Sequence, residues 1–390
     1  MPQPLKVSEF LKTAVAAAHH FGFESVDTLT NSRICKECTL RRDHKANAAE
    51  RKIDALGGLL TNGMCAYLDN KLHAIEGPVL FYTVETVPRT GETALTFQVL
   101  NVEKSIAESL LIETMRSVLK SAGYGNSSVR INSLGDQDSA VRYTRELTNF
   151  LKKRLDEMPP VARELMKEHA ALALMHLIEK EHDLGLRSPS PLEYLSDASR
   201  KHFREIVEYL DMSETPYEID AKLMGHHHCY SETIFSFDLK DENNERPLVE
   251  PFIVRGGRYN AFTSRMVKGG VPASGAVIVL KNQPTLANFP RFGKPGVPTV
   301  SIVQLGFGPK IRSLMVLDEL RQAGIPVAQD LVSDSLSSQL RRAEERNTRF
   351  AIIIGQKEFV DKSAIIRDLH SRSQETIPMS GLVNYLKRFA

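Results

Sequence analysis

Residues 248–282 constrain the fold more than any other part of this chain. The apolar side chains of Val249, Phe252, Ile253 and Val254 predict a β-strand, and Gly256 and Gly257 are predicted to end it. A short polar segment follows, and Ala276–Leu280 is a second apolar run typical of a buried strand. Two buried strands joined by a glycine turn predict the floor of a site, with an ordinary turn between core strands as the plainer alternative.

The glycine pair and the next residue are the first candidate ligand contacts. Glycine has no Cβ, so the backbone at Gly256 and Gly257 can approach a ligand closely or adopt positive φ. Arg258 is then expected at the rim of the site as a fixed cation.

Composition limits the class of protein. The 390 residues suffice for two or three domains, and 42% hydrophobic with 25% charged residues is typical of a globular protein. The net charge of +2 gives no overall argument for nucleic acid, so a polyanion site would be a local patch, and no DNA partner is expected. Long apolar runs and a signal pattern are absent, which predicts a cytoplasmic protein without a membrane partner.

The four cysteines do not predict a disulfide framework. Cys35 and Cys38 form a CxxC within a strongly charged segment, and with His44 they could hold zinc. The second ligand pair that usually accompanies such a motif is missing, so solvated surface is the favoured interpretation and no metal site is predicted.

The first 285 residues mix strands with helices. Leu59–Leu72 is predicted to begin with a Thr-Asn-Gly turn and continue as a helix, and a turn carrying Arg89 joins two strands into a hairpin. Residues 136–212 have helical periodicity and form an insertion. The predicted helices are Val7–Phe23 and Ser105–Ser121, and the predicted strands are Val79–Val84, Ala94–Val102, Ser128–Gly135, Tyr217–Ile219 and Glu232–Leu239.

A segment rich in proline and glycine, residues 286–298, is predicted to be a linker to a second domain. In residues 299–390 strands alternate with helices, which predicts a compact α/β domain with a mostly parallel sheet. The predicted strands are Thr299–Leu305, Ile325–Ala328, Phe350–Ile354 and Ala364–Leu369, and the predicted helices are Ile311–Ala323, Ser335–Arg346 and Met379–Phe389.

Several motifs, in one order along the chain, resemble the histidyl-tRNA synthetase family of class II. They are RINSLG at Arg130–Gly135, PLEYLSDASRKHFREIVEYLD from Pro191, PYEID from Pro216, GGRYN from Gly256, and LRQAGIPVAQD followed by SLSSQLRRAEERNTRFAIIIG near the C-terminus. The resemblance implies an α+β core, in which an antiparallel catalytic sheet is flanked by helices, followed by an α/β anticodon-binding-like domain. It also implies a homodimer that binds tRNA, and ATP with Mg²⁺ as cofactors if synthetase activity survives.

The resemblance assigns the candidate site residues, and several depart from the family pattern. Asn62 and Gly63 stand where the family has an acidic turn that pairs with the substrate ammonium. Arg89 is a misregistered substitute for an arginine that grips a phosphate, and Glu103 matches a pocket glutamate. The family's third motif ends Gly-Leu-Glu-Arg, and its arginine pairs with the γ-phosphate, but this chain has Val279-Leu280-Lys281-Asn282 there. Lys281 could reach a phosphate as a point charge but cannot make the bidentate contact. The substrate-binding candidates are Asn62, Gly63, Tyr230, Gly256, Gly257, Arg258 and Tyr259, and the catalytic candidates are Arg89, Glu103 and Lys281.

In the histidine-specific segment the family arginine is replaced by Gly225, and Tyr230 is retained. His226–His228 and Cys229 lie between these two positions and suggest a metal site as an alternative. Adjacent strand residues point to opposite faces, however, so these four side chains cannot all bind one ion. In the C-terminal domain, Lys310, Arg341 and Arg342 are candidate phosphate contacts for tRNA. Because Glu344 and Glu345 follow them, a solvated helix face is the alternative.

Three functions fit these observations. The first is a non-catalytic or weakly catalytic paralogue of histidyl-tRNA synthetase that binds tRNA or regulates. Removing one preorganised charged donor costs ~10²–10³ in rate, so the losses above disfavour ordinary adenylation. The second is an active histidine–tRNA ligase in which Arg89, Glu103 and Lys281 act. The third is a regulatory subunit of ATP phosphoribosyltransferase, a class that generally lacks the anticodon-binding domain.

Overall fold

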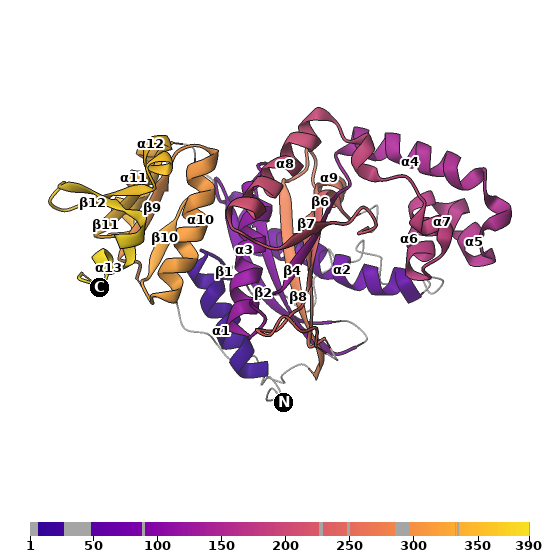
Figure 1. The fold of residues 1–390 in the computed structure, drawn as a ribbon, viewed down its shortest axis with the longest axis horizontal. Coiled ribbons are helices and arrows are strands. Elements are labelled where there is room, and N and C mark those ends of the chain that lie inside the picture. Colours follow the sequence, from indigo (N-terminus) through magenta and orange to yellow (C-terminus); the bar gives the residue numbers. More distant parts are fainter. Residues whose placement is uncertain are drawn as a thin grey trace.

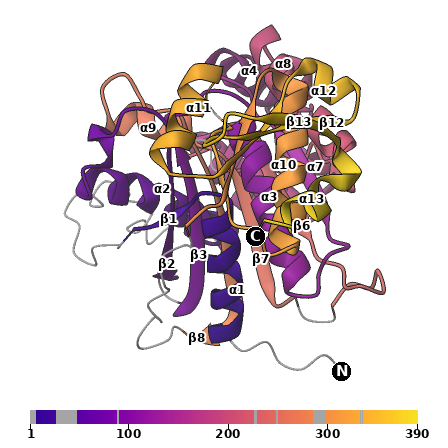
Figure 2. The same cartoon turned by 90° about the vertical axis from the view of Figure 1, so that its left-hand side faces the viewer.

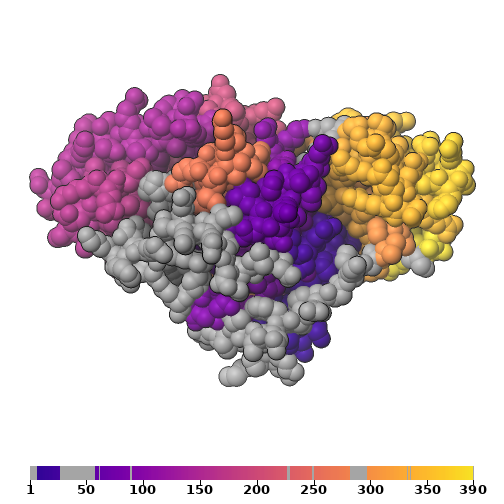
Figure 3. All heavy atoms as spheres, turned by 180° about the vertical axis from the view of Figure 1, so that it is seen from behind, coloured from indigo at the N-terminus to yellow at the C-terminus, as the bar shows by residue number. Residues whose placement is uncertain are grey.

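The computed structural model describes residues 7–26, 48–87, 90–225, 229–247, 250–284, 297–331, 333 and 335–389. They form a core region around an eight-stranded sheet, and a C-terminal domain, residues 297–389, around a five-stranded sheet (Figure 1). Figure 3, a space-filling view from behind, shows the C-terminal domain at one end of the molecule and the helices of residues 136–212 at the other. Among the described residues, no helix is both long and apolar enough to span a bilayer.

The core sheet is antiparallel except at its two edges. Its strand order is β1-β2-β3-β8-β7-β6-β4-β5, with parallel pairing only for β1 with β2 and for β4 with β5. The predicted antiparallel core sheet is therefore confirmed. The strands are β1 (Glu24–Ser25), β2 (Val79–Thr86), β3 (Glu92–Leu100), β4 (Ser128–Ser133), β5 (Tyr217–Ile219), β6 (Ser231–Asp238), β7 (Phe252–Arg258) and β8 (Ala273–Pro284).

Helices cover both faces of this sheet (Figure 1). On one face α1 (Val7–His20), α3 (Ile106–Ser121) and α8 (Asp197–Met212) contribute to the largest hydrophobic cluster, because their apolar residues recur at helical spacing. On the other face lies α2 (Ala48–Asp69), whose apolar residues pack on β3 and β8. The short helix α9 (Asn260–Met266) connects β7 to β8.

Residues 136–212, all of which the structure describes, are helical and have a hydrophobic cluster of their own. Asp136 begins this region as an N-cap, accepting a hydrogen bond from the Ser139 backbone N–H at 2.9 Å. Before α8 the helices are α4 (Gln137–Lys152), α5 (Pro160–Glu168), α6 (Ala170–Glu179) and α7 (Asp183–Leu186).

The C-terminal sheet has the order β10-β9-β11-β12-β13 and is mixed, not mostly parallel as predicted. The β9–β10 and β9–β11 pairs are parallel, whereas β11–β12 and β12–β13 are antiparallel. A short segment that contains the helix α12 connects β11 to β12, and a short turn connects β12 to β13; neither is long enough for a crossover to a parallel strand. The strand β13 was not predicted. The elements are β9 (Val300–Gln304), α10 (Phe307–Gln322), β10 (Val327–Gln329), α11 (Leu336–Glu345), β11 (Phe350–Ile354), α12 (Gln356–Val360), β12 (Ser363–Asp368), β13 (Gln374–Pro378) and α13 (Leu382–Leu386).

The C-terminal domain packs on the core through α10, which lies beside α1 and α3 (Figure 2). Asp318 on α10 accepts a hydrogen bond from Ser117 Oγ at 3.0 Å, and Leu317 O lies 2.7 Å from His20 Nε2. Gln329 at the end of β10 donates to Phe21 O at 3.0 Å. Most of the predicted linker, residues 286–296, is outside the described residues.

Two local predictions around the site are wrong. The strand β7 does not end at Gly256 and Gly257 but runs through them to Arg258, because both glycines stay paired with β6 and β8. The predicted Thr-Asn-Gly turn is a continuous part of α2.

Residues 379–389, at the end of the C-terminal domain, form less helix than predicted. They contain a single 3₁₀ turn (Met379–Gly381) and α13.

Candidate functional site

The face of the core sheet that α2 covers, here called the α2 face, is the candidate ligand-binding face. Strand residues alternate between the two faces, and the register of the ladder shows which side chains share this one. One row across the sheet holds Arg130, Ser236, Arg255, Val277, Thr96 and Thr83, each opposite the next on neighbouring strands.

The middle of the α2 face is apolar. Leu59 and Leu60 of α2 are 1% exposed and belong to one cluster with Val277 and Val279 of β8. Ala94 of β3 and Ile234 of β6 belong to the same cluster on either side of β8 and β7. The helix therefore seals the central strands with aliphatic side chains, and the polar groups of the face lie to either side of this seal.

On the β2 side the polar groups are hydrogen-bonded to one another. Asn62 Nδ2 donates to Glu85 Oε2 at 3.0 Å, and Thr83 Oγ1 donates to Glu85 Oε1 at 2.6 Å. The hydroxyls of Thr83 and Thr96 are 2.6 Å apart. The candidate Asn62 thus binds a protein carboxylate from within a helix, and its neutral amide takes the place that the family fills with an acid.

The candidates Gly63 and Tyr259 meet at Gln98 of β3. A Cβ added at Gly63 would lie 2.2 Å from Gln98 Nε2, so glycine is needed for α2 to approach the sheet here. Gln98 donates to Leu60 O at 3.2 Å and accepts from the Tyr259 hydroxyl at 2.6 Å. Burial raises the pKa of Tyr259, so its hydroxyl remains a donor.

Arg258 does not stand at a rim, contrary to the prediction. Because β7 continues through the glycines, the alternation places Arg258 on the face opposite α2, where its side chain is 1% exposed. It donates to both carboxylate oxygens of Glu108 at 2.7 Å. Its role is to join β7 to α3.

Gly256 and Gly257 let strands approach each other. A Cβ at Gly256 would lie 2.3 Å from the Phe235 ring and 2.6 Å from Gly275 O, and a Cβ at Gly257 would lie 2.5 Å from Thr233 O. In this structure their absent side chains therefore make room for protein neighbours.

Arg255, which the sequence analysis missed, is a cation on the α2 face. Its guanidinium donates to Met224 O, beside Gly225 where the family has arginine, and lies 5.9 Å from the ring centre of Tyr230. The available signal was a charged residue inside the apolar strand pattern of residues 252–258, at the same strand parity as Ile253. Tyr230 is 4% exposed, and burial raises the pKa of its hydroxyl to about 12.

The structure does not bring the catalytic candidates together. Lys281 lies at one end of the β3–β8 ladder and forms an ion pair with Glu250 at 3.3 Å. Glu103 is exposed and follows the opposite end of β3, a strand of nine residues that spans roughly 30 Å. Arg89 lies outside the described residues, as do Cys35, Cys38, His44 and His226–His228. In the part of the chain that is described, no group of three or more His, Cys, Asp or Glu side chains could hold a metal ion.

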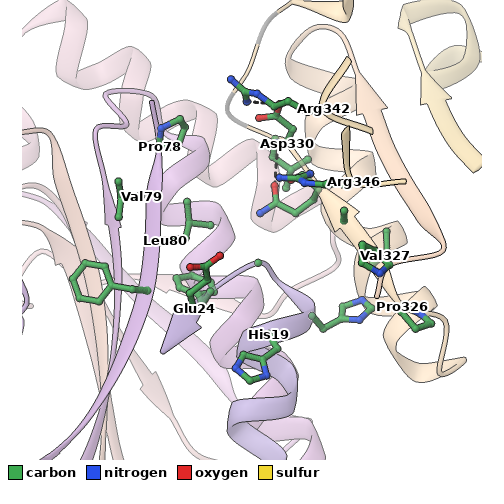
Figure 4. A pocket seen from close by; sticks show the side chains of 18 of the residues that line it. His19, Glu24, Pro78, Val79, Leu80, Pro326, Val327, Asp330, Arg342 and Arg346 are labelled. Atoms are coloured by element: carbon green, nitrogen blue, oxygen red, sulfur yellow. Dashed lines mark hydrogen bonds and ion pairs between the residues drawn. The ribbon is translucent and has the colours of Figure 1, made fainter. Parts of the chain in front are cut away.

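A cavity of about 800 Å³ lies between the core and the C-terminal domain (Figure 4). Its core wall includes His19 of α1 and Glu24 of β1, and its opposite wall includes Arg342 and Arg346 at the end of α11. Sequence reasoning could not find this cavity, because its walls come from segments roughly 300 residues apart in the chain.

The basic groups of this cavity are only partly neutralised. Arg342 Nη1 forms an ion pair with Asp330 Oδ2 at 2.5 Å, while Arg346 Nη1 donates to Gln329 O at 3.5 Å. Burial lowers the pKa of His19, whose Nε2 lies 3.1 Å from the Tyr82 hydroxyl, so this histidine is neutral near pH 7.

The three tRNA-binding candidates differ in accessibility. The side chain of Arg341 is 70% exposed and that of Arg342 is 37% exposed, so both can be reached from solvent. Lys310 is only 4% exposed, because its position on α10 faces the interior of the domain. In this structure Lys310 is not accessible to an RNA backbone.

Comparisons with known proteins agree with these features. Residues 302–389 match the family described as anticodon binding domain. The histidine–tRNA ligase of Latilactobacillus sakei is 24% identical over 335 residues, covering 81% of this chain and 76% of that protein. The histidine–tRNA ligase of Desulforamulus reducens is 26% identical over 333 residues, covering 83% and 78%.

The fold is also similar to a solved structure. The apo histidyl-tRNA synthetase of S. aureus superposes with a TM-score of 0.52 at 16% identity, covering 99% of this chain and 98% of that one. The antiparallel core and the C-terminal mixed sheet therefore have the fold of a histidyl-tRNA synthetase, and the two sequence matches make the chain similar to histidine–tRNA ligases over about four fifths of its length.

Proposed function

We propose that this protein is a synthetase-like paralogue that binds tRNA and adenylates histidine weakly or not at all. The observation that carries the proposal is the apolar seal of the α2 face, where Leu59 and Leu60 pack on Val277 and Val279. A nucleotide bound there would have to displace aliphatic side chains that are withdrawn from water, at about 25 cal/mol per Å² of apolar surface exposed again.

The charged groups of the α2 face support the same proposal. ATP and Mg²⁺ need several converging cations and carboxylates. On the described part of the face, Lys281 is paired with Glu250, and Glu85 is bound by Asn62 and Thr83. Arg255 offers one guanidinium without a carboxylate partner among the described residues, and one such cation does not fit a nucleotide triphosphate with its metal ion.

Binding of tRNA is supported by the C-terminal domain. The family match covers residues 302–389, and Arg341, Arg342 and Arg346 are basic residues of α11 and its end. Such side chains bind RNA phosphates and make affinity depend on salt. The family resemblance motivates four further parts of the proposal. They are the catalytic and substrate-binding roles of the candidate residues, the division between domains at residues 286–298, a homodimer and a cytoplasmic location.

An active histidine–tRNA ligase is the second candidate. Arg255 favours it, because it places a guanidinium on the α2 face beside Gly225, from a position that the motifs did not indicate. A regulatory subunit of ATP phosphoribosyltransferase is disfavoured by the anticodon binding domain at residues 302–389.

Two measurements on the purified full-length chain test the proposal. Histidine-dependent ATP–pyrophosphate exchange is expected near background, and filter binding of bulk tRNA is expected to saturate and to weaken with salt. Exchange at a rate typical of working synthetases, ~1 s⁻¹ or more, would establish the ligase instead. Absence of saturable tRNA binding would overturn the binding part of the proposal.

A further inference from the structure

We propose that Arg255, together with the hydroxyls of Ser236 and Tyr230, forms a binding site for the oxyanion group of a small ligand, a carboxylate or a phosphate, on the α2 face. This inference goes beyond the proposed function, because it requires neither adenylation nor tRNA binding. It follows from the buried polar groups of these three side chains that have no hydrogen-bond partner among the described residues.

The guanidinium of Arg255 makes few hydrogen bonds to the described residues of the protein. Its Nη2 donates to Met224 O, and its Nε is buried without a hydrogen-bond partner among the residues that the structure describes. No described carboxylate forms an ion pair with it. Desolvation by burial lowers the pKa of Arg255, Tyr230 opposes this change, and the nearby charge of Arg130 adds to it.

Two neighbouring arginines show how this fold normally treats such a charge. Arg258, on the opposite face of the same strand, receives both oxygens of Glu108. Arg130, in the same row as Arg255, is paired with Asp220 at 3.3 Å and Asp238 at 3.0 Å. Both of these cations are matched by carboxylates, whereas no described carboxylate is paired with Arg255. A bound anion would supply the missing charge.

The hydroxyl groups beside Arg255 are also without partners. Ser236 lies directly opposite Arg255 on β6, so their Cβ atoms are neighbours at about 5 Å. Ser236 is 8% exposed and Tyr230 is 4% exposed, and neither hydroxyl has a hydrogen-bond partner among the described residues. Both hydroxyls can donate a hydrogen bond: a serine hydroxyl is protonated at ordinary pH, and burial raises the pKa of Tyr230 to about 12.

A guanidinium fork and two hydroxyl donors have the chemistry of an oxyanion site. The fork matches a carboxylate or phosphate edge, and the hydroxyls can satisfy the remaining lone pairs. A cationic ligand is excluded by Arg255 itself. A purely apolar ligand would leave all three polar groups unpaired.

The test is thermal unfolding of the full-length protein in HEPES buffer, with ionic strength held constant by potassium chloride. Inorganic phosphate and acetate are titrated separately as probes. We expect at least one of them to raise Tm by roughly 2 °C at saturation. A response to phosphate alone identifies a phosphate ligand, and a response to acetate alone identifies a carboxylate ligand.

Variants decide whether Arg255 is responsible. Arg255→Gln should abolish the anion-dependent shift while Arg130→Gln, the matched control from the same row, retains it. Ser236→Ala and Tyr230→Phe keep the charge and should each weaken anion binding by about 5–10-fold, which preserves the test if Arg255→Gln does not fold. An equal shift in wild type and Arg255→Gln, or no shift with either probe, would overturn the proposal.

Discussion

Arg258 Nε and Nη2 each lie 2.7 Å from one carboxylate oxygen of Glu108, so the two side chains form a bidentate ion pair inside the core. The same guanidinium donates to Val102 O at 2.9 Å and Lys104 O at 3.1 Å, and His202 Nε2 of α8 lies 2.9 Å from Glu108 Oε1. Strand β7, the start of α3 and α8 are thereby held together on the face opposite α2.

Replacing one member of this pair should strongly destabilise the protein. Glu108→Gln leaves the buried charge of Arg258 uncompensated, and we expect a loss of about 3–5 kcal/mol in the free energy of unfolding. Urea denaturation followed by circular dichroism measures it. The matched control is Glu164→Gln, which removes an exposed pair with Lys167 and should leave the urea midpoint unchanged. Equal midpoints for both variants would contradict the assigned role of Glu108.

Acid should weaken the protein through the same carboxylate. Burial alone would raise the pKa of Glu108, but Arg258 and His202 outweigh burial and lower it to about 2 from the model-compound value of 4.5. A lowered pKa means that the stabilisation is fully present above pH 4.5 and is lost as pH falls toward 2, by roughly 3 kcal/mol. Stability measured across this range should fall less steeply in Glu108→Gln than in wild type. Parallel curves would show that Glu108 does not titrate in this way.

His202 predicts a second effect of opposite sign. Burial lowers the pKa of His202, but the charge and hydrogen bond of Glu108 raise it above 6.5 overall. Its contribution is therefore fully present below pH 6.5 and is lost as pH rises through the raised pKa. Wild type should lose stability relative to His202→Gln as pH rises above 6.5. A direct check is NMR titration of the imidazole, and a pKa below 6.5 would contradict the interaction.

The packing of α2 on the sheet can be tested with two glycines of that helix. Gly63→Ala places a methyl group against Gln98 and disturbs its bonds to Leu60 and Tyr259, so we expect destabilisation of about 1–3 kcal/mol. Apart from the backbone of α2 itself, no atom of the described residues lies within 4 Å of a Cβ added at Gly58, so Gly58→Ala should stabilise by up to ~1 kcal/mol through helix propensity. Thermal unfolding of both variants is the measurement. Stabilisation by both would mean that α2 does not contact β3 in this way.

The basic residues of α11 should differ from Lys310 in their effect on RNA. If α11 contacts tRNA phosphates, Arg341→Gln combined with Arg346→Gln removes up to two counterion-releasing contacts and should reduce the slope of log affinity against log salt by about 1–2. Lys310→Met should leave the slope unchanged, because Lys310 is buried. Filter binding of tRNA at roughly 50 to 200 mM salt measures the slope for each protein. Equal slopes in all proteins would place the RNA on another surface.

Much of the fold could be predicted because the apolar pattern is local. The runs at Val79–Val84 and Phe350–Ile354 lie on β2 and β11, and the helical period of Ser105–Ser121 corresponds to α3. The failures occurred where pairing partners decide the structure. Gly256 and Gly257 are strong turn residues by themselves, but their pairing with β6 and β8 keeps them in a strand.

The sequence by itself determined most of the strands and helices, their order and the resemblance to histidyl-tRNA synthetases, because periodicity and motifs are properties of the chain read in one dimension. Only the tertiary structure decided which face each charge occupies, because a strand that continues through two glycines places Arg258 on the α3 side and Arg255 on the α2 side. It likewise decided that Leu59 and Leu60 seal the α2 face and that an arginine from β7 lies beside Gly225. Such neighbours belong to distant segments, and contacts between distant segments arise only when the chain folds.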